Sequence, residues 1–187
     1  MLLYYLIVIL PVMAVLSLLV YLPFYLWGRR KWGKRPMSRH LVLYALIGAL
    51  LSLLYLTIFM DGLALDFSPD YHLLNLTPFA WIREPYAMGT ANMVRQLVLN
   101  VLMLVPLGVI LPVACPRLRR GWRTVLCIFL LIVGIEMLQY FIRRFCNVDD
   151  LMMNTAGGLI GWWLFAGANR LWKGRRWWQN ALGQPLQ

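Results

Sequence analysis

The chain has 187 residues, of which 61% are hydrophobic and only 13% charged, and its mean hydropathy is +0.68. Soluble domains are closer to half apolar and a quarter charged, so this composition excludes an ordinary soluble protein and predicts an integral membrane protein. The net charge of +11 comes from short basic clusters beside apolar runs. This placement favours contact with membrane lipids that carry anionic headgroups, and we expect no nucleic-acid partner.

Five apolar runs follow one another along the chain, each close to or above the roughly 20 residues that a helix needs to cross a bilayer. Their approximate bounds are 2–27, 41–60, 95–113, 124–142 and 151–169. We therefore predict an all-α protein, a polytopic membrane helical bundle of about five transmembrane helices, in which residues 1–187 form a single transmembrane domain. No basic residue precedes the first run, so we interpret it as a retained helix rather than a cleaved signal peptide. The three cysteines, Cys115, Cys127 and Cys146, have neither disulfide nor metal-ligand spacing, so we expect no disulfide partner and no metal site.

The connections between these runs differ in charge. Those at 28–40 and 114–123, together with the tail 170–187, hold fourteen basic residues and no acidic one, whereas those at 61–94 and 143–150 hold three basic and six acidic residues. Because basic flanks stay in the cytoplasm, this alternation predicts an N-terminus outside and a C-terminus in the cytoplasm. Residues 170–187 are then a basic, aromatic cytoplasmic tail whose tryptophans anchor it at the inner leaflet.

Polar side chains are concentrated near the outer ends of three runs. Glu136 lies inside an apolar run, where an ionisable side chain costs about 2.5–3.5 kcal/mol on insertion scales. Helical spacing places the polar residues of each run on one face of a helix: Gln96 and Asn100 on the third, Glu136, Gln139 and Arg143 on the fourth, and Asp150 and Asn154 on the fifth. In lipid such faces must meet one another or line a watery cleft, so we predict a shared pocket that opens outward. The alternative is packing contacts alone, with Glu136 paired to an arginine and Asn100 to Asn154.

Three further features bear on this region. The step from Gly157 to Gly161 is a Gly-x-x-x-Gly motif, which predicts close approach of another helix. Pro106 removes a backbone donor inside the third run and predicts a kink there. The outer connection 61–94 is rich in aromatic residues and proline, so we expect it to lie as a flap at the headgroup interface, over the outer mouth of the bundle.

Several of these residues recur together in one known family. They are NLTPF at 75–79, Asn100, Pro106-Leu107-Gly108 followed by Leu111-Pro112, Glu136 with Gln139, and Arg144 through VDDLMMNTAGGLIG. In order and spacing they resemble the VanZ-like family of bacterial membrane proteins, with a core that we place at 61–165. One departure is Asn147, where family members often carry aspartate. The resemblance implies a multi-pass protein of the bacterial cytoplasmic (inner) membrane and a link to low-level resistance to the lipoglycopeptide teicoplanin. It implies no settled chemical activity, and the cofactor is unknown.

Two hypotheses of different classes follow. In the first, the outward pocket binds a lipid-linked envelope precursor or a lipoglycopeptide. If the protein is an enzyme, the same pocket also processes this ligand. The arginines would bind phosphate or carboxylate oxygens, and Asp149 with Asp150 would help to bind a divalent ion. The candidate ligand-binding residues are Asn100, Gln139, Arg143, Arg144, Asp149 and Asn154. Its candidate catalytic residues are Glu136, as general acid or base, and Asp150.

The second hypothesis is non-enzymatic. The chain would be a structural or partner-binding membrane subunit, or a small carrier in which Glu136 relays protons. The sequence has no Ser-His-Asp set, Walker loop or HExxH motif, which argues against hydrolases and ATPases of those types.

Overall fold

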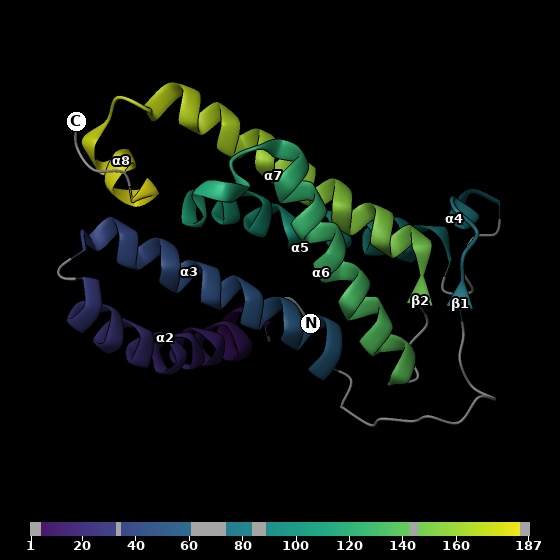
Figure 1. Ribbon diagram of the computed structural model, residues 1–187. Helices are drawn as coiled ribbons and strands as arrows, with labels where there is room; N and C mark the ends of the chain where they lie inside the picture. The colour runs from purple at the N-terminus through teal and green to yellow at the C-terminus, as the bar shows by residue number, and fades with distance from the viewer. Residues whose placement is uncertain (1–4, 33–34, 61–73, 84–88, 143–145, 184–187) are drawn as a thin grey trace.

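The structure, a computed structural model, describes residues 5–32, 35–60, 74–83, 89–142 and 146–183 (Figure 1). Its long helices are α2 (Leu10–Trp32), α3 (Met37–Leu54), α5 (Thr90–Ala114), α6 (Gly121–Phe141) and α7 (Val148–Trp172). Its short elements are η1 (Tyr5–Ile9), η2 (Tyr55–Phe59), β1 (Leu74–Asn75), α4 (Ala80–Arg83), η4 (Pro116–Leu118), β2 (Cys146–Asn147) and α8 (Arg176–Leu182). The predicted all-α class is confirmed, and each predicted apolar run coincides with one long helix and its extensions.

Four helices in the described part of the chain are long and apolar enough to cross a membrane. They cover Ile7–Arg30, Met37–Phe59, Thr90–Ala114 and Gly121–Phe141. α7, the fifth expected span, has 25 residues, or about 37 Å at 1.5 Å per residue, which is long enough for a bilayer. It is not among the four; Asp149, Asp150 and Asn154 stand in its first two turns, and four glycines follow. The fifth crossing therefore stays a prediction.

The connecting segments gather at two opposite ends of the bundle. Figure 1 places the end of α2, the start of α3 and α8 at one end, and β1, β2 and α4 at the other. The α5–α6 connection belongs to the first end, because Arg119 Nη2 donates a hydrogen bond of 2.9 Å to Leu182 O at the end of α8. The three basic connections thus share one end of the molecule, as the charge alternation requires. The side of the membrane that this end faces stays a prediction.

α5 and α7 pack along most of their length through glycine. A Cβ added to Gly157 would lie 2.9 Å from the carbonyl carbon of Val101, and one added to Gly161 would lie 2.7 Å from Gly108 Cα. No side chain fits at such distances, so the predicted close approach at the Gly157–Gly161 step is confirmed, and its partner is α5. α5 itself continues as one helix through Pro106 and Pro112.

Apolar side chains on both sides of this pair complete the bundle. A buried core joins α3, α5 and α6; its members are Leu53, Leu104, Leu107, Leu111, Ile128, Ile132 and Ile135. α2 packs against α3 and leaves large apolar side chains uncovered, among them Leu18 at 54% and Leu19 at 60% exposure. Hydrocarbon tails are as apolar as leucine, so these side chains suit contact with lipid.

Arg39 holds the basic end of the bundle together. Its Nη1 donates to Val113 O and to Ala181 O, both at 3.0 Å, and its Nη2 donates to Ala114 O at 2.5 Å. These carbonyls end α5 and α8, where helices leave acceptors without intrahelical donors and where a cation is favourable. α8 is therefore folded back onto the bundle, with Trp178 buried against Phe165.

Candidate functional site

The polar cluster at the end that carries β1 and β2 begins with Glu136 on α6. Its side chain is only 8% exposed and accepts a hydrogen bond from the Cys146 thiol on β2. Burial raises the pKa of Cys146, and the hydrogen bond and negative charge of Glu136, with the charge of Asp150, raise it further, to about 12. Cys146 lies outside the membrane-spanning helices, and at neutral pH its thiol is protonated and acts as a donor to Glu136.

Asp150, in the first turn of α7, links this pair to α5. Asn100 Nδ2 donates a hydrogen bond of 2.6 Å to Asp150 Oδ1. Asn100 on α5 therefore meets Asp150 on α7 directly, and Cys146 on β2 lies close enough to Asp150 and to Glu136 on α6 for both charges to act on its thiol. The bond between Asn100 and Asp150 joins the polar faces of α5 and α7, and the shared pocket and the roles of these residues stay predictions.

Asp149 has a different environment from its neighbour. It is fully buried, and its Oδ1 accepts a hydrogen bond of 2.7 Å from the backbone N–H of Phe79. Phe79 has a φ of 59°, a left-handed conformation that is uncommon without glycine, and Asp149 binds the amide presented there. This bond fastens the segment after β1 to the start of α7.

Asn147 stabilises the same junction. Its Oδ1 accepts a hydrogen bond of 3.0 Å from Asp149 N, which makes it the N-cap of α7. β2 also pairs in parallel with β1, with Leu74 opposite Cys146 and Asn75 opposite Asn147. Asparagine and aspartate cap helices about equally well, so the departure at Asn147 retains the capping function.

Gln139 and Asn154 complete the predicted set that the structure describes. Gln139 Nε2 donates to Thr57 O at 2.8 Å, which ties α6 to η2. Asn154, one turn beyond Asp150, is 5% exposed, and its Oδ1 is buried without a hydrogen-bond partner among the described residues. A buried acceptor left without a donor costs roughly 1–3 kcal/mol, so a ligand that brings an N–H or O–H group would recover this energy.

The remaining predictions about the site have mixed outcomes. Arg143 and Arg144 lie outside the described residues, as does most of the expected flap at 61–94. The pairing of Asn100 with Asn154 is wrong: Asn100 binds Asp150, because Asp150 rather than Asn154 lies level with it across the α5–α7 contact. Within the described residues no three His, Cys, Asp or Glu side chains are grouped as metal ligands.

Sequence reasoning missed three participants. Cys146 lacks any motif, and only the fold places it against Glu136. Thr57 contributes a backbone carbonyl, which no side-chain pattern can reveal. Asn147 was recognisable in principle, because an asparagine directly before an apolar helix with acidic residues in its first turn is a helix-start signal.

Together, the apolar helices and the shared polar cluster define the chain as a helical membrane protein with a polar site built from several spans. A family model described as VanZ/LLP1 matches residues 41–172, which is more than half of the chain. The protein therefore belongs to the VanZ/LLP1 family. The match includes every residue of the polar cluster described above. Neither the curated proteins nor the solved structures compared with the chain gave a match.

Proposed function

We propose that this VanZ-like protein is a multi-pass protein of the bacterial cytoplasmic membrane whose outward-facing polar pocket binds a lipid-linked or amphiphilic cell-envelope ligand. The observation that carries the proposal is Asn154: its amide oxygen is buried and has no donor among the described residues, one helical turn from the Asp150 carboxyl group. Buried polar groups in proteins are normally paired, and an exception calls for a specific explanation. A bound ligand is that explanation here.

The surrounding groups define the chemistry of the ligand. Asn154 Oδ1 and the carboxyl groups of Glu136 and Asp150 are acceptors, so they suit hydroxyl or ammonium groups. Arg143 and Arg144 follow the same helix in the sequence and supply cations for a phosphate or carboxylate. A lipid-linked envelope precursor has both kinds of group, and so does a lipoglycopeptide such as teicoplanin, to which the family resemblance points.

Other predicted residues support the walls of the pocket in this proposal. Gln139 holds η2 through Thr57 O, and Asp149 holds the segment after β1 through Phe79 N. In an enzymatic form of the proposal, Glu136 acts as general acid or base next to the Cys146 thiol, with Asp150 in the same network. Binding alone requires only the arrangement of acceptors.

A second candidate is a structural or partner-binding subunit, or a small carrier with Glu136 as a proton relay. Two bonds favour packing: Asn100 to Asp150 joins α5 to α7, and Gln139 to Thr57 joins α6 to η2. Interhelical bonds of this kind average about 0.6 kcal/mol.

Expression in a teicoplanin-susceptible bacterium tests the proposal. Wild-type protein should raise the minimal inhibitory concentration of teicoplanin, and Asn154→Leu and Glu136→Gln should return it to the level of empty vector while the amount of protein in the membrane stays unchanged. Gly134→Ala is the matched control on α6, because a Cβ there meets no described atom within 4 Å, and it should retain the full effect.

The alternatives give different results in the same experiment. Loss of resistance in proportion to loss of folded protein would favour a packing role. Loss in Glu136→Gln alone, together with dependence on the proton gradient, would favour a relay. If the wild-type protein leaves teicoplanin susceptibility unchanged and does not bind purified teicoplanin, teicoplanin is excluded as the ligand.

A further inference from the structure

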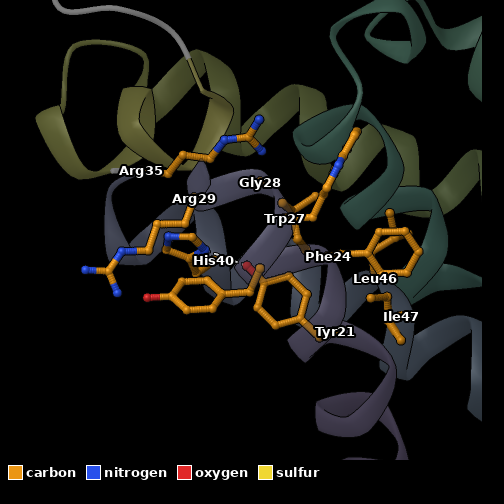
Figure 2. Close-up of a pocket in the computed structure, with 11 residues that line it drawn as sticks. Tyr21, Phe24, Trp27, Gly28, Arg29, Arg35, His40, Leu46 and Ile47 are labelled. Carbon is orange, nitrogen blue, oxygen red and sulfur yellow. Dashed lines mark hydrogen bonds between the residues drawn. The ribbon is translucent and has the colours of Figure 1, made fainter. Parts of the chain in front are cut away.

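A separate cavity lies at the opposite end of the molecule, between α2 and α3 (Figure 2). It has a volume of about 330 Å³, and most of its lining is apolar and aromatic, including Phe24, Trp27 and Ile47. A second hollow of about 320 Å³ shares Phe24 and Trp27 and adds Pro23, so the apolar surface extends along α2. The polar cluster around Glu136 contributes no residue to either hollow.

The walls of this cavity are fixed by contacts between the two helices. The Tyr21 hydroxyl and His40 Nδ1 are 2.5 Å apart and share a hydrogen bond, which Figure 2 shows as a dashed line. His40 also meets the ring of Tyr25 edge to face, at 5.1 Å between ring centroids. Tyr44 on α3 donates to Ala14 O on α2 at 2.8 Å. Hydrogen bonds and ring contacts between α2 and α3 therefore hold the aromatic side chains that form the walls of the cavity.

Positive charge borders the cavity on the side of the helix connection. Arg29 and Arg35 line it with exposed side chains, and the charge of Arg35 acts on the Tyr21 phenol. Arg39, on the same connection, bonds the carbonyls that end α5 and α8 and is not among the described residues that line the cavity. None of the described residues that line the cavity is acidic, and the sequence of the connection 28–40 contains six basic residues and no acidic one.

We propose that this cavity binds one anionic phospholipid, with the phosphate at Arg29 and Arg35 and an acyl chain along Phe24 and Trp27. The charge selects an anion, because a basic residue near a membrane surface contributes about 1 kcal/mol toward anionic lipid. The apolar lining selects a lipid over free phosphate, which would gain nothing from aromatic walls. The position at the end of two apolar helices places the arginines at headgroup level and the aromatic rings beside the acyl chains. This inference is independent of the function proposed above.

Native mass spectrometry of the full-length protein tests the proposal. The protein is purified from nanodiscs that contain equal amounts of phosphatidylglycerol and phosphatidylcholine, and the retained lipid is counted. Wild-type protein should retain one phosphatidylglycerol in preference to phosphatidylcholine. In the double variant Arg29→Gln, Arg35→Gln this preference should fall by about 25-fold, since each of the two arginines contributes about fivefold.

Two controls make the result decisive. Arg170→Gln, Arg176→Gln removes the same charge from exposed positions of the chain that do not line the cavity, and it should leave the preference unchanged. Ile47→Trp fills the cavity but keeps both arginines, so it should reduce retention of the lipid even if the double arginine variant fails to fold.

Three outcomes would overturn the proposal. In the first, Arg29→Gln, Arg35→Gln retains the wild-type preference. In the second, both double variants lose it equally, which would mean that only the total charge of this end matters. In the third, millimolar inorganic phosphate displaces the lipid, or Ile47→Trp retains it fully, either of which would mean that the apolar cavity plays no part.

Discussion

Hydrogen bonding between single residues determines the character of the polar cluster. Three different elements contribute Glu136, Cys146 and Asp150, yet the charges of both carboxyl groups raise the pKa of the Cys146 thiol. Asn100 donates a hydrogen bond of 2.6 Å to Asp150, which offsets part of the free-energy cost of partly burying that carboxyl group. Because each buried polar group is expensive unless it is paired, Asn154 Oδ1, a buried acceptor that has no donor among the described residues, is a place where a ligand would gain free energy.

Cys146 offers a direct chemical test of this environment. A pKa of about 12 against an ordinary 9.0 leaves on the order of one thousandth of the thiolate that a free cysteine has below pH 9. In a background without Cys115 and Cys127, iodoacetamide at pH 8.5 should therefore react with Cys146 far more slowly in folded than in unfolded protein. Glu136→Gln removes a negative charge and lowers the Cys146 pKa, so alkylation of the folded protein should become faster at the same pH. Gly134→Ala serves as the control, and equal rates in the two variants would contradict the Glu136–Cys146 contact.

Asp149 offers a second test, because its role is structural. Asp149→Ala removes a charge-assisted hydrogen bond to Phe79 N and should destabilise the protein by about 2 kcal/mol. Asp149→Asn retains an oxygen at the same place and should cost clearly less. Thermal unfolding in detergent measures both effects, and protease cleavage within 74–83 should increase only in the alanine variant. Equal destabilisation by alanine and asparagine would show that the bond to Phe79 contributes nothing.

At the level of helices, the contact between α5 and α7 sets the geometry of the site. Gly157 and Gly161 bring the α7 backbone against Val101, Val105 and Gly108 of α5. This contact fixes how far α7 is displaced along α5, and hence which polar residues of the two helices lie level. Asn100 and Asp150 meet because Gly157 and Gly161, about two and three turns further along α7, are in register with the α5 backbone.

Substitution of these glycines tests the contact. Gly157→Ala and Gly161→Ala each place a Cβ within 3 Å of α5 backbone atoms, and overpacking of this kind typically costs about 1–3 kcal/mol. Gly167→Ala is the matched control on the same helix, because a Cβ there meets no described atom within 4 Å, and it should be neutral or stabilising by about 1 kcal/mol through helix propensity. The measurement is the midpoint of unfolding in a detergent titration. Equal tolerance at all three positions would exclude the close contact.

For the whole molecule, the separation of charge between the two ends is the dominant feature. The connection around 28–40, the η4 segment and α8 share one end, where Arg39 and Arg119 bind carbonyls of neighbouring elements. Burial lowers the pKa of Arg119, but an arginine remains a cation throughout the physiological range. This basic end is expected to stay in the cytoplasm, which places the Glu136 cluster on the outer side.

Labelling of intact cells tests this orientation and the fifth crossing together. Thr77→Cys and Arg175→Cys, each in a background without the native cysteines, lie in exposed positions at opposite ends of the molecule. A membrane-impermeant maleimide should label Cys at position 77 in intact cells and at position 175 only after permeabilisation. Labelling of both positions from the outside would mean that α7 does not cross the membrane, and the reverse pattern would invert the whole topology.

The sequence by itself determined the class of the protein, the positions of the five long helices and the residues on their polar faces. These properties depend on local composition and on the helical period, and both can be read from a short continuous stretch of sequence. The charge of each connection likewise predicted which segments would share an end, and the structure places them so.

Only the tertiary structure decided which polar groups meet. Periodicity assigns Asn100, Asp150 and Asn154 to helix faces, but it leaves the displacement of one helix along another undetermined, and that displacement decides that Asn100 binds Asp150. The bond between Cys146 and Glu136 depends on where the chain turns after α6, and the cavity between α2 and α3 depends on how two helices diverge. Each of these is a relation between distant segments, and the free energy that fixes it comes from packing across the bundle rather than from any local run of residues.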